Sequence, residues 1–167
     1  MPDKKTINRV KRAKREGKSA DAQAGEFVRE EIEHIREGKH GARSAKQAIA
    51  IGLSKARRAG IDLKPPKKGT VSEKTRKSAK RAYEKGRKHE PVSPTRSRAS
   101  VRALKREGRT AVSRDALSRQ ARAAAKKRTP SQRSASAKQA AKTKGPRKRS
   151  QAAKKAARTR ARRKAQR

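Results

Sequence analysis

Three histidines, His34, His40 and His89, are the first candidates for chemistry beyond simple charge, and His34 has acidic neighbours on both sides. Those neighbours are Glu30, Glu31, Glu33 and Glu37. Imidazole and carboxylate groups can bind a divalent metal, and a carboxylate pair such as Glu30 and Glu33 could transfer protons. We favour a simpler interpretation, a charged and solvent-facing helix surface, because the sequence indicates no pocket that would shift these pKa values. We therefore predict no metal site, no cofactor and no enzymatic activity.

Two other kinds of reactive site are also missing from the sequence. The chain contains no cysteine, which excludes disulfide bonds, thiolate metal sites and cysteine nucleophiles. The segment Gly38-Lys39-His40-Gly41 combines glycines with a lysine, but it lacks the spacing of a phosphate-binding P-loop. The chemistry of the chain is therefore the chemistry of its charged side chains.

Lysine and arginine dominate those charges: 54 of 167 residues, against 14 aspartates and glutamates, for a net charge of +40. Such side chains neutralise phosphates and release condensed counterions, so they bind nucleic acid without reading its sequence. One basic run alone is typical of a solvated surface, but a charge of +40 exceeds what solubility requires. The candidate nucleic-acid-binding residues are Lys11, Arg12, Lys14, Arg15, Lys46, Lys55, Arg57, Arg58, Lys126, Lys127, Arg128, Arg147, Lys148, Arg149, Lys154, Lys155, Arg158, Arg160, Arg162, Arg163 and Lys164.

The type of nucleic acid is constrained by what the chain lacks. Single-strand binding normally uses aromatic stacking platforms, and Phe27 and Tyr83 are the only aromatic residues of that kind. Base reading requires a rigid element that presents side chains to base edges. We therefore expect contacts to the backbone of duplex DNA, with RNA as the open alternative because the same cations serve either polymer.

The elements that must position these residues are predicted to be helices. Hydrophobic residues make up 29% of the chain, which is too little for one large core, and low hydrophobicity with high net charge is typical of disorder. We expect a mostly α protein: one small helical hairpin followed by a long basic tail that is largely disordered or conditionally helical. No apolar run approaches the roughly 18 residues of a membrane span, and no secretory signal is present. We thus expect no membrane partner and a cytoplasmic location.

The hairpin is predicted over residues 25–63. In its first helix, Val28, Ile32 and Ile35 fall at i, i+4 and i+7 and draw an apolar stripe, and Gly38 is a plausible stop. The glutamates of this helix are expected in its first turns, where they complement the helix dipole.

The second helix of the hairpin is predicted to begin after Ser44, which with Gln47 fits a capping box. Gly60 fits the position after its end, with Ile61 folding back onto the helix. Small residues on the second helix would allow the two helices to approach closely; these residues are Ala48, Gly52 and Ala56. Because a hairpin of this size is only marginally stable alone, we expect it either to form a homodimer or to be only partly stable.

Charge divides the rest of the chain. Residues 1–63 carry a net charge of +7 and residues 64–167 a net charge of +33, with Pro65-Pro66 as the natural boundary. We interpret the chain as four segments: 1–24, a basic arm; 25–63, the hairpin; 64–96, a basic linker with a short helix; and 97–167, an Ala/Lys/Arg-rich tail.

Short basic helices are predicted within this framework at 5–18, 72–90, 97–107 and 113–128. Their apolar stripes are too narrow to predict firm packing. Like charges at i and i+4 oppose them, and a bound polyanion would remove that repulsion. We therefore expect helix to form there on binding.

Two resemblances accompany these patterns. The stretch Glu26–Gly41, followed by Lys46–Ser54 and Ala56–Gly60, is similar to a small basic bacterial family of unknown function, sometimes labelled plasmid stabilisation or DNA-binding proteins. Its most specific part is the run KQAIAIGLS. The C-terminal region resembles linker-histone and bacterial histone-like tails in composition, and Ser93-Pro94-Thr95-Arg96 is similar to their minor-groove turn. The winged-helix domain of linker histones is missing. The resemblances imply a DNA-binding protein.

The sequence therefore favours a histone-like DNA-binding protein, nucleoid- or plasmid-associated, that acts by phosphate neutralisation and could serve plasmid stabilisation. Two alternatives stay open. The protein could associate with RNA or the ribosome, or the hairpin could bind a protein partner while the polycationic tail only localises it.

Overall fold

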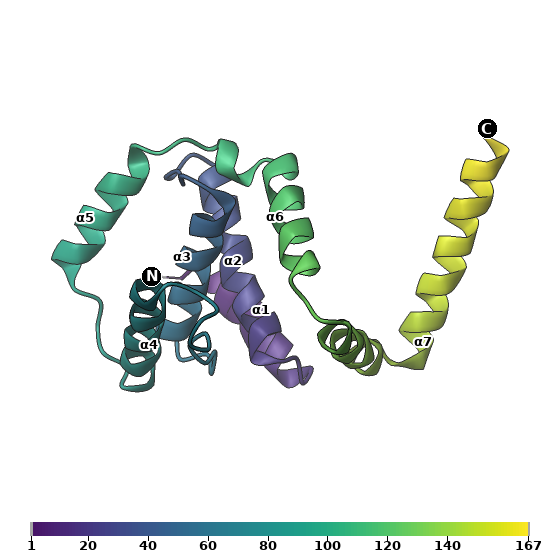
Figure 1. The fold of residues 1–167 in the computed structure, drawn as a ribbon, viewed down its shortest axis with the longest axis horizontal. Coiled ribbons are helices and arrows are strands. Elements are labelled where there is room, and N and C mark those ends of the chain that lie inside the picture. Colours follow the sequence, from purple (N-terminus) through teal and green to yellow (C-terminus); the bar gives the residue numbers. More distant parts are fainter. Residues whose placement is uncertain (1, 167) are drawn as a thin grey trace. The chain divides into compact units, whose positions relative to one another are not determined.

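A computed structural model describes residues 2–166, and every regular element in that range is helical (Figure 1). The prediction of a mostly α protein is confirmed. The elements are α1 (Lys4–Arg15), α2 (Ala20–Arg36), α3 (Ala45–Arg58), α4 (Glu73–Arg87), α5 (Pro94–Lys105), a 3-10 turn η1 (Thr110–Val112), α6 (Arg114–Lys126) and α7 (Pro130–Ala165). They divide into two compact units, one up to Ala124 and one from Ala125 onward.

Helix α2 is the centre of the first unit and is longer than predicted. It begins after Ser19, whose hydroxyl accepts a hydrogen bond from the Ala22 amide at 3.3 Å, rather than near Gly25. Its glutamates therefore lie in the middle of the helix and not in its first turns, which corrects the dipole argument. Its end is as predicted, since Gly38 takes the left-handed conformation (φ 78°) that favours glycine.

Helix α3 begins and ends at the predicted signals. The Ser44 hydroxyl accepts from the Gln47 amide at 3.2 Å, but the Gln47 side chain accepts from the Arg43 amide, one residue before the position that a capping box requires. At the other end Gly60 is left-handed (φ 83°), and the Ile61 amide reaches back to the Ala56 carbonyl at 3.1 Å. This pattern is the Schellman end that the sequence predicted.

Helices α2 and α3 approach each other closely at Gly52. A Cβ atom added to Gly52 would lie only 2.6 Å from the Val28 Cα atom, so no larger residue fits without moving backbone. The small residues of α3 thus play their predicted role. The resulting core contains the fully buried side chains of Phe27 and Ala56, together with Leu63 from the following loop.

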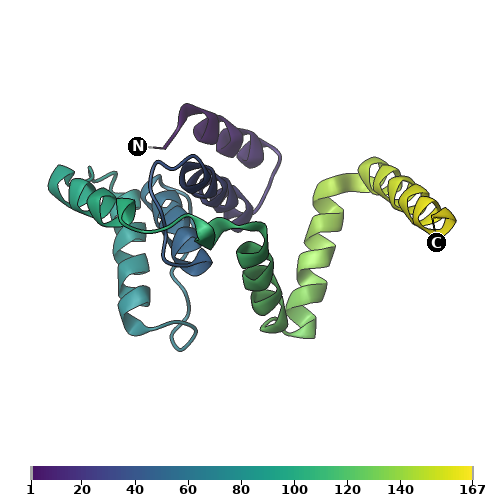
Figure 2. The same cartoon turned by 90° about the horizontal axis from the view of Figure 1, so that it is seen from above.

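Helices α1 and α4 pack against this pair, although their narrow apolar stripes predicted otherwise. Figure 2 shows α1 beside α2 and α4 beside α3. Helix α1 buries Val10 and Ala13, and α4 buries Ala79 and Ala82. Small side chains suffice here because they let the helix backbones come close, so packing does not depend on large apolar residues.

A second cluster holds a distant segment against the α2–α3 end. Ala111 and Val112 of η1 are buried with Ile35 and Ala48. The turn after α2 also bonds to this segment, because the Gly41 amide donates to the Leu104 carbonyl at 2.9 Å. The hairpin is therefore covered by α1, α4 and η1 of its own chain, which gives it the support that we expected from a homodimer.

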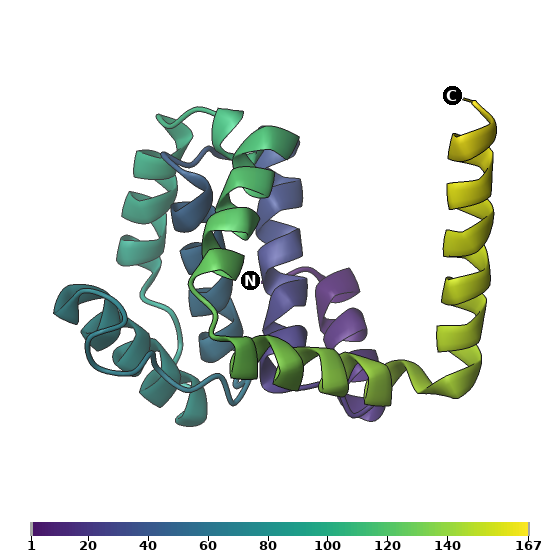
Figure 3. The ribbon, with the colours of Figure 1, turned by 45° about the vertical axis from the view of Figure 1, so that its right-hand side comes forward.

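The basic tail is helical, and the prediction of a largely disordered tail is not supported. Helices α5 and α6 occupy most of residues 94–126, and α7 follows in the second unit (Figure 3). Alanine, lysine, arginine and glutamine have high helix propensities, and the helices begin at side-chain caps such as Thr129, which forms a full capping box with Gln132. Propensity and capping thus outweigh the low hydrophobicity on which the disorder prediction was based.

Helix α7 is interrupted once. Gly145 has a non-helical backbone (φ 70°, ψ 169°), and Pro146 follows it. Within residues 130–165 no side chain is buried, so α7 has no apolar face to pack. None of the helices formed by residues 2–166 is long and apolar enough to cross a membrane.

Candidate nucleic-acid interface

The cations of the tail are fully available to a ligand. All of the candidate residues from Lys126 to Lys164 are exposed. No acid follows Asp115 in the sequence, and within the described chain none of these side chains forms an ion pair. Helix α7 alone carries 14 lysines and arginines and no acid. The result is two exposed cationic helical segments, joined at Gly145 and Pro146, with no acid on either.

The candidate residues of α1 form a second exposed group. Helix α1 turns Thr6, Val10 and Ala13 inward, which leaves the basic residues on its outer side. Those residues are Lys11, Arg12, Lys14 and Arg15. Arg12 lies 3.9 Å from the Glu16 carboxylate, an exposed pair at helix spacing, and such pairs contribute little free energy. These cations therefore remain available to a polyanion.

The four candidates on α3 do not form one basic face. Lys46 is exposed, whereas the Lys55 ammonium lies 2.5 Å from the buried Glu31 carboxylate and Arg58 is half-buried. Arg57 is 7% exposed, and its Nε donates to the Leu63 carbonyl at 3.0 Å. Burial lowers the pKa of the Arg57 guanidinium because it penalises the charged form. Arg57 thus holds the loop after α3 in place, and α3 offers no row of cations that could read a groove.

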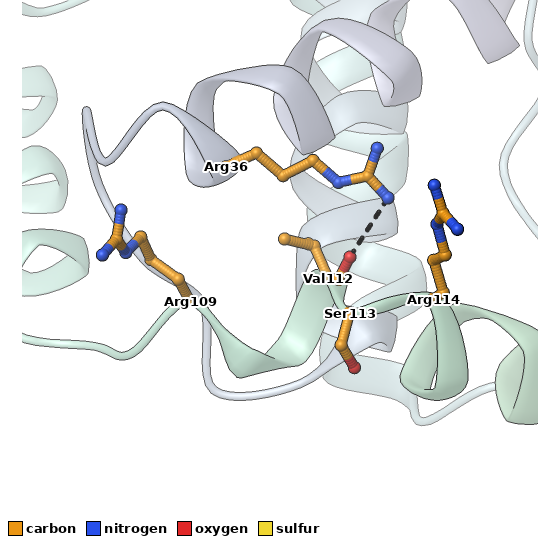
Figure 4. Close-up of a pocket in the computed structure, with 5 residues that line it drawn as sticks. All are labelled: Arg36, Arg109, Val112, Ser113 and Arg114. Carbon is orange, nitrogen blue, oxygen red and sulfur yellow. Dashed lines mark hydrogen bonds between the residues drawn. The ribbon is translucent and has the colours of Figure 1, made fainter.

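A basic pocket that the sequence did not predict lies where η1 meets the end of α2. This shallow hollow of about 440 Å³ is lined by Arg36, Arg109, Val112, Ser113 and Arg114. Figure 4 shows that its three arginines come from the end of α2, the residue before η1 and the start of α6. The Arg36 guanidinium donates to the Val112 carbonyl at 3.3 Å, which fixes its position and leaves its other N–H groups available.

The electrostatics of the basic pocket favour an anion. None of the described residues that line it is acidic. The pocket also adjoins the N-terminal end of α6, where Ser113 caps the helix by accepting from the Ala116 amide at 3.2 Å. A second hollow shares Arg109 with it and adds two lysines, Lys39 and Lys105, and one acid, Glu107. Together they form a basic surface on the first unit that is separate in sequence from the tail.

The sequence carried only a partial signal for the basic pocket. Ser113 was recognisable as the start of a helix, and Arg109 and Arg114 flank it closely. Arg36 is far away in sequence and reaches the site only because η1 packs on the end of α2. The pocket therefore depends on a long-range contact that charge patterns do not reveal.

The interpretation of a solvent-facing acidic surface around His34 is wrong for Glu30 and Glu31, whereas the side chains of Glu33 and Glu37 are 40% and 57% exposed. Glu30 is 1% exposed and Glu31 is 0% exposed. The His40 Nε2 lies 3.1 Å from the Glu31 carboxylate, and the His34 Nε2 lies 3.1 Å from the Asp3 carboxylate. Helix α2, the residue before α1 and the turn after α2 therefore bring together a group of titratable side chains that is buried at Glu30 and Glu31 and exposed at Asp3.

Comparison with known proteins leaves the function open. Residues 4–69 match the model of a family of unknown function, DUF6496. The matched range begins with α1 and ends in the loop before α4, so it contains the packed helices α1 to α3. Neither the curated proteins nor the solved structures contain a match. The family match accordingly concerns the folded N-terminal part and not the cationic tail.

Proposed function

We propose that the protein binds duplex DNA through its phosphates, without reading base sequence, as a nucleoid- or plasmid-associated protein. The observation that carries the proposal is the run of exposed and unpaired cations on α6 and α7 with no acid after Asp115. Each lysine or arginine that neutralises a phosphate releases condensed counterions, which supplies affinity independent of base sequence. Bridging or compaction of DNA, and with it plasmid stabilisation, would follow from several such contacts per chain.

The form of α7 suits this mechanism. Phosphate contacts carry no base information, so exposed cations spaced along both segments of α7 can bind the duplex without a particular base sequence. The break at Gly145 and Pro146 separates two helical rods that can follow the DNA backbone independently. We further propose that DNA stabilises the helix, because bound phosphates reduce repulsion between like charges one turn apart.

The basic pocket would add a positioned contact. Arginine presents a planar set of donors that matches phosphate oxygens in pairs, and Arg36 is already oriented by its bond to Val112. A phosphate seated between Arg36 and Arg114, whose guanidinium groups lie on the same side of the pocket with Arg109 on the other (Figure 4), would fix the first unit on the duplex while the tail supplies most of the counterion release. The shallow, open form of the pocket suits a backbone phosphate better than a small ligand that must be enclosed.

The test is binding of the full chain, and of a chain truncated after Arg128, to matched DNA and RNA duplexes over a salt series. The truncation preserves the first unit, which a cut near Pro66 would divide because α4 packs on α3. We expect the full chain to bind duplex DNA with an affinity that falls steeply with salt, and the truncated chain to lose most of that slope.

Two results would contradict the proposal. The full chain could fail to bind duplex DNA at physiological salt, or it could bind the RNA duplex much more tightly than the DNA duplex. The second result would favour an RNA-associated role, since the same cations serve both polymers.

A further inference from the structure

Two groups of potential metal ligands meet at His34 in the first unit. The first group comprises Asp3, Glu30 and His34, and the second comprises Glu31, His34 and His40. Within each group the potential ligand atoms all lie within 4.8 Å of one another. Glu30 and His34 are one turn apart on α2, so their side chains share a face of that helix. Asp3 comes from the residue before α1, so the first group joins two helices.

Glu30 lacks a partner for its charge. It is 1% exposed, and its Oε2 accepts only a long bond, 3.3 Å, from the Asp3 amide. Its buried Oε1 has no hydrogen-bond partner among the described residues, and no lysine or arginine there forms an ion pair with Glu30. A carboxylate removed from water costs several kcal/mol unless it is paired or binds a metal. This buried carboxylate oxygen is therefore a candidate ligand for a cation.

Lys55 distinguishes the two groups. Its ammonium lies 2.5 Å from the Glu31 carboxylate, so the charge of Glu31 is already compensated. The carboxylates of Asp3 and Glu30 have no described lysine in ion-pair contact, since Lys39 acts on both and Lys55 acts on Asp3 only at longer range, and the imidazole of His34 lies beside them. The Asp3–Glu30–His34 group is thus the stronger site for an added cation, and Glu31 with His40 supports it from the neighbouring side of His34.

We propose that Asp3, Glu30 and His34 bind a divalent transition-metal ion of the zinc class. Imidazole nitrogen with carboxylate oxygen is a ligand set of zinc and its first-row neighbours, whereas magnesium and calcium prefer oxygen alone. Tetrahedral ligands at zinc distances are about 3.3 Å apart. The Asp3 Oδ2 and His34 Nε2 atoms, at 3.1 Å, are already near that spacing.

The ion would fasten the start of α1 to the middle of α2. The present links between these helices include the ion pair of Arg9 with Glu26 at 3.0 Å, which is partly exposed. Binding to the folded state alone raises its stability by mass action. The net charge of +40 repels cations from the rest of the chain, so saturable metal binding would point to this acidic group. The inference does not depend on the proposed DNA binding.

The experiment is calorimetric titration of the full, tag-free, metal-stripped chain with Zn²⁺, together with thermal melting. We expect one Zn²⁺ per chain and a higher Tm with the ion. Glu30→Gln and Asp3→Asn should each weaken binding at least about tenfold, because even the loss of an outer-shell partner of a ligand costs about 10–100-fold. Asp3→Asn guards against failure to fold, because the Asp3 side chain is 52% exposed and asparagine also suits the start of a helix.

Two matched controls test the assignment. Glu33→Gln removes a carboxylate from the same helix outside both groups, and His89→Asn removes an imidazole outside them; both should leave Zn²⁺ affinity nearly unchanged. Visible absorption of the Co²⁺ form should show His34 as a nitrogen ligand by its loss in His34→Gln. The proposal is overturned if Glu33→Gln weakens binding as much as Glu30→Gln, if wild type binds no Zn²⁺, or if Mg²⁺ binds as tightly as Zn²⁺.

Discussion

At the scale of single residues, the close contact at Gly52 makes the sharpest stability prediction. In Gly52→Ala the new methyl would meet the Val28 backbone, which is not free to move as a side chain is. We expect a loss of about 1–3 kcal/mol in the free energy of unfolding, measured by urea titration, as for other overpacked sites. Gly25→Ala is the matched control in α2: among the described atoms none lies within 4 Å of its added Cβ, so it should stabilise by about 0.5–1 kcal/mol. Equal effects of the two substitutions would refute the close approach.

Arg57 is predicted to stabilise the fold and not to bind DNA. Arg57→Gln removes the donor to the Leu63 carbonyl, so we expect about 1–3 kcal/mol of lost stability with DNA affinity nearly unchanged. Lys46→Gln, at an exposed position of the same helix, should leave stability unchanged. Paired denaturation and DNA-binding measurements decide the point. A large loss of DNA affinity in a still folded Arg57→Gln chain would return Arg57 to the interface.

At the scale of elements, the break in α7 can be removed. Gly145→Ala with Pro146→Ala replaces a left-handed glycine and a proline by the best helix former, so a continuous helix should result. The mean distance between spin labels at Ser134 and Thr159 should then be longer than in the parent chain, and its distribution should be narrower. Unchanged distances would mean that the break does not depend on these two residues.

The elements also show what sequence alone could predict. Local signals were sufficient at Ser44, Gly38 and Gly60, because a cap or a left-handed glycine acts within one turn of its helix. The packing of α1 and α4 was missed because alanine gives a weak apolar signal, although it permits close helix contact. The sequence showed His34, Glu30 and Glu31 as candidate ligands but not their burial or the approach of Asp3, and it did not show the basic pocket, because only tertiary contact brings these residues together.

At the scale of the whole molecule, the basic pocket and the tail should contribute differently to DNA binding. Each lost phosphate contact reduces the salt slope by about 0.9. Replacing Arg36, Arg109 and Arg114 together by glutamine, with the tail intact, should therefore weaken DNA binding. It should reduce the salt slope by up to about three times that amount. The measurement is affinity for one DNA duplex over a salt series, with thermal melting to confirm that the first unit stays folded.

A control with the same charge makes this prediction specific. Arg29, Arg76 and Lys80 lie on the first unit, and each is already ion-paired with a glutamate of its own helix. Replacing those three by glutamine removes the same charge without touching the basic pocket. If net charge alone governed affinity, both triple variants would weaken binding equally. The pocket would then contribute only through its share of the net charge. A larger loss from the pocket variant would instead mean that the fold brings three distant arginines to one pocket where they contact DNA phosphates.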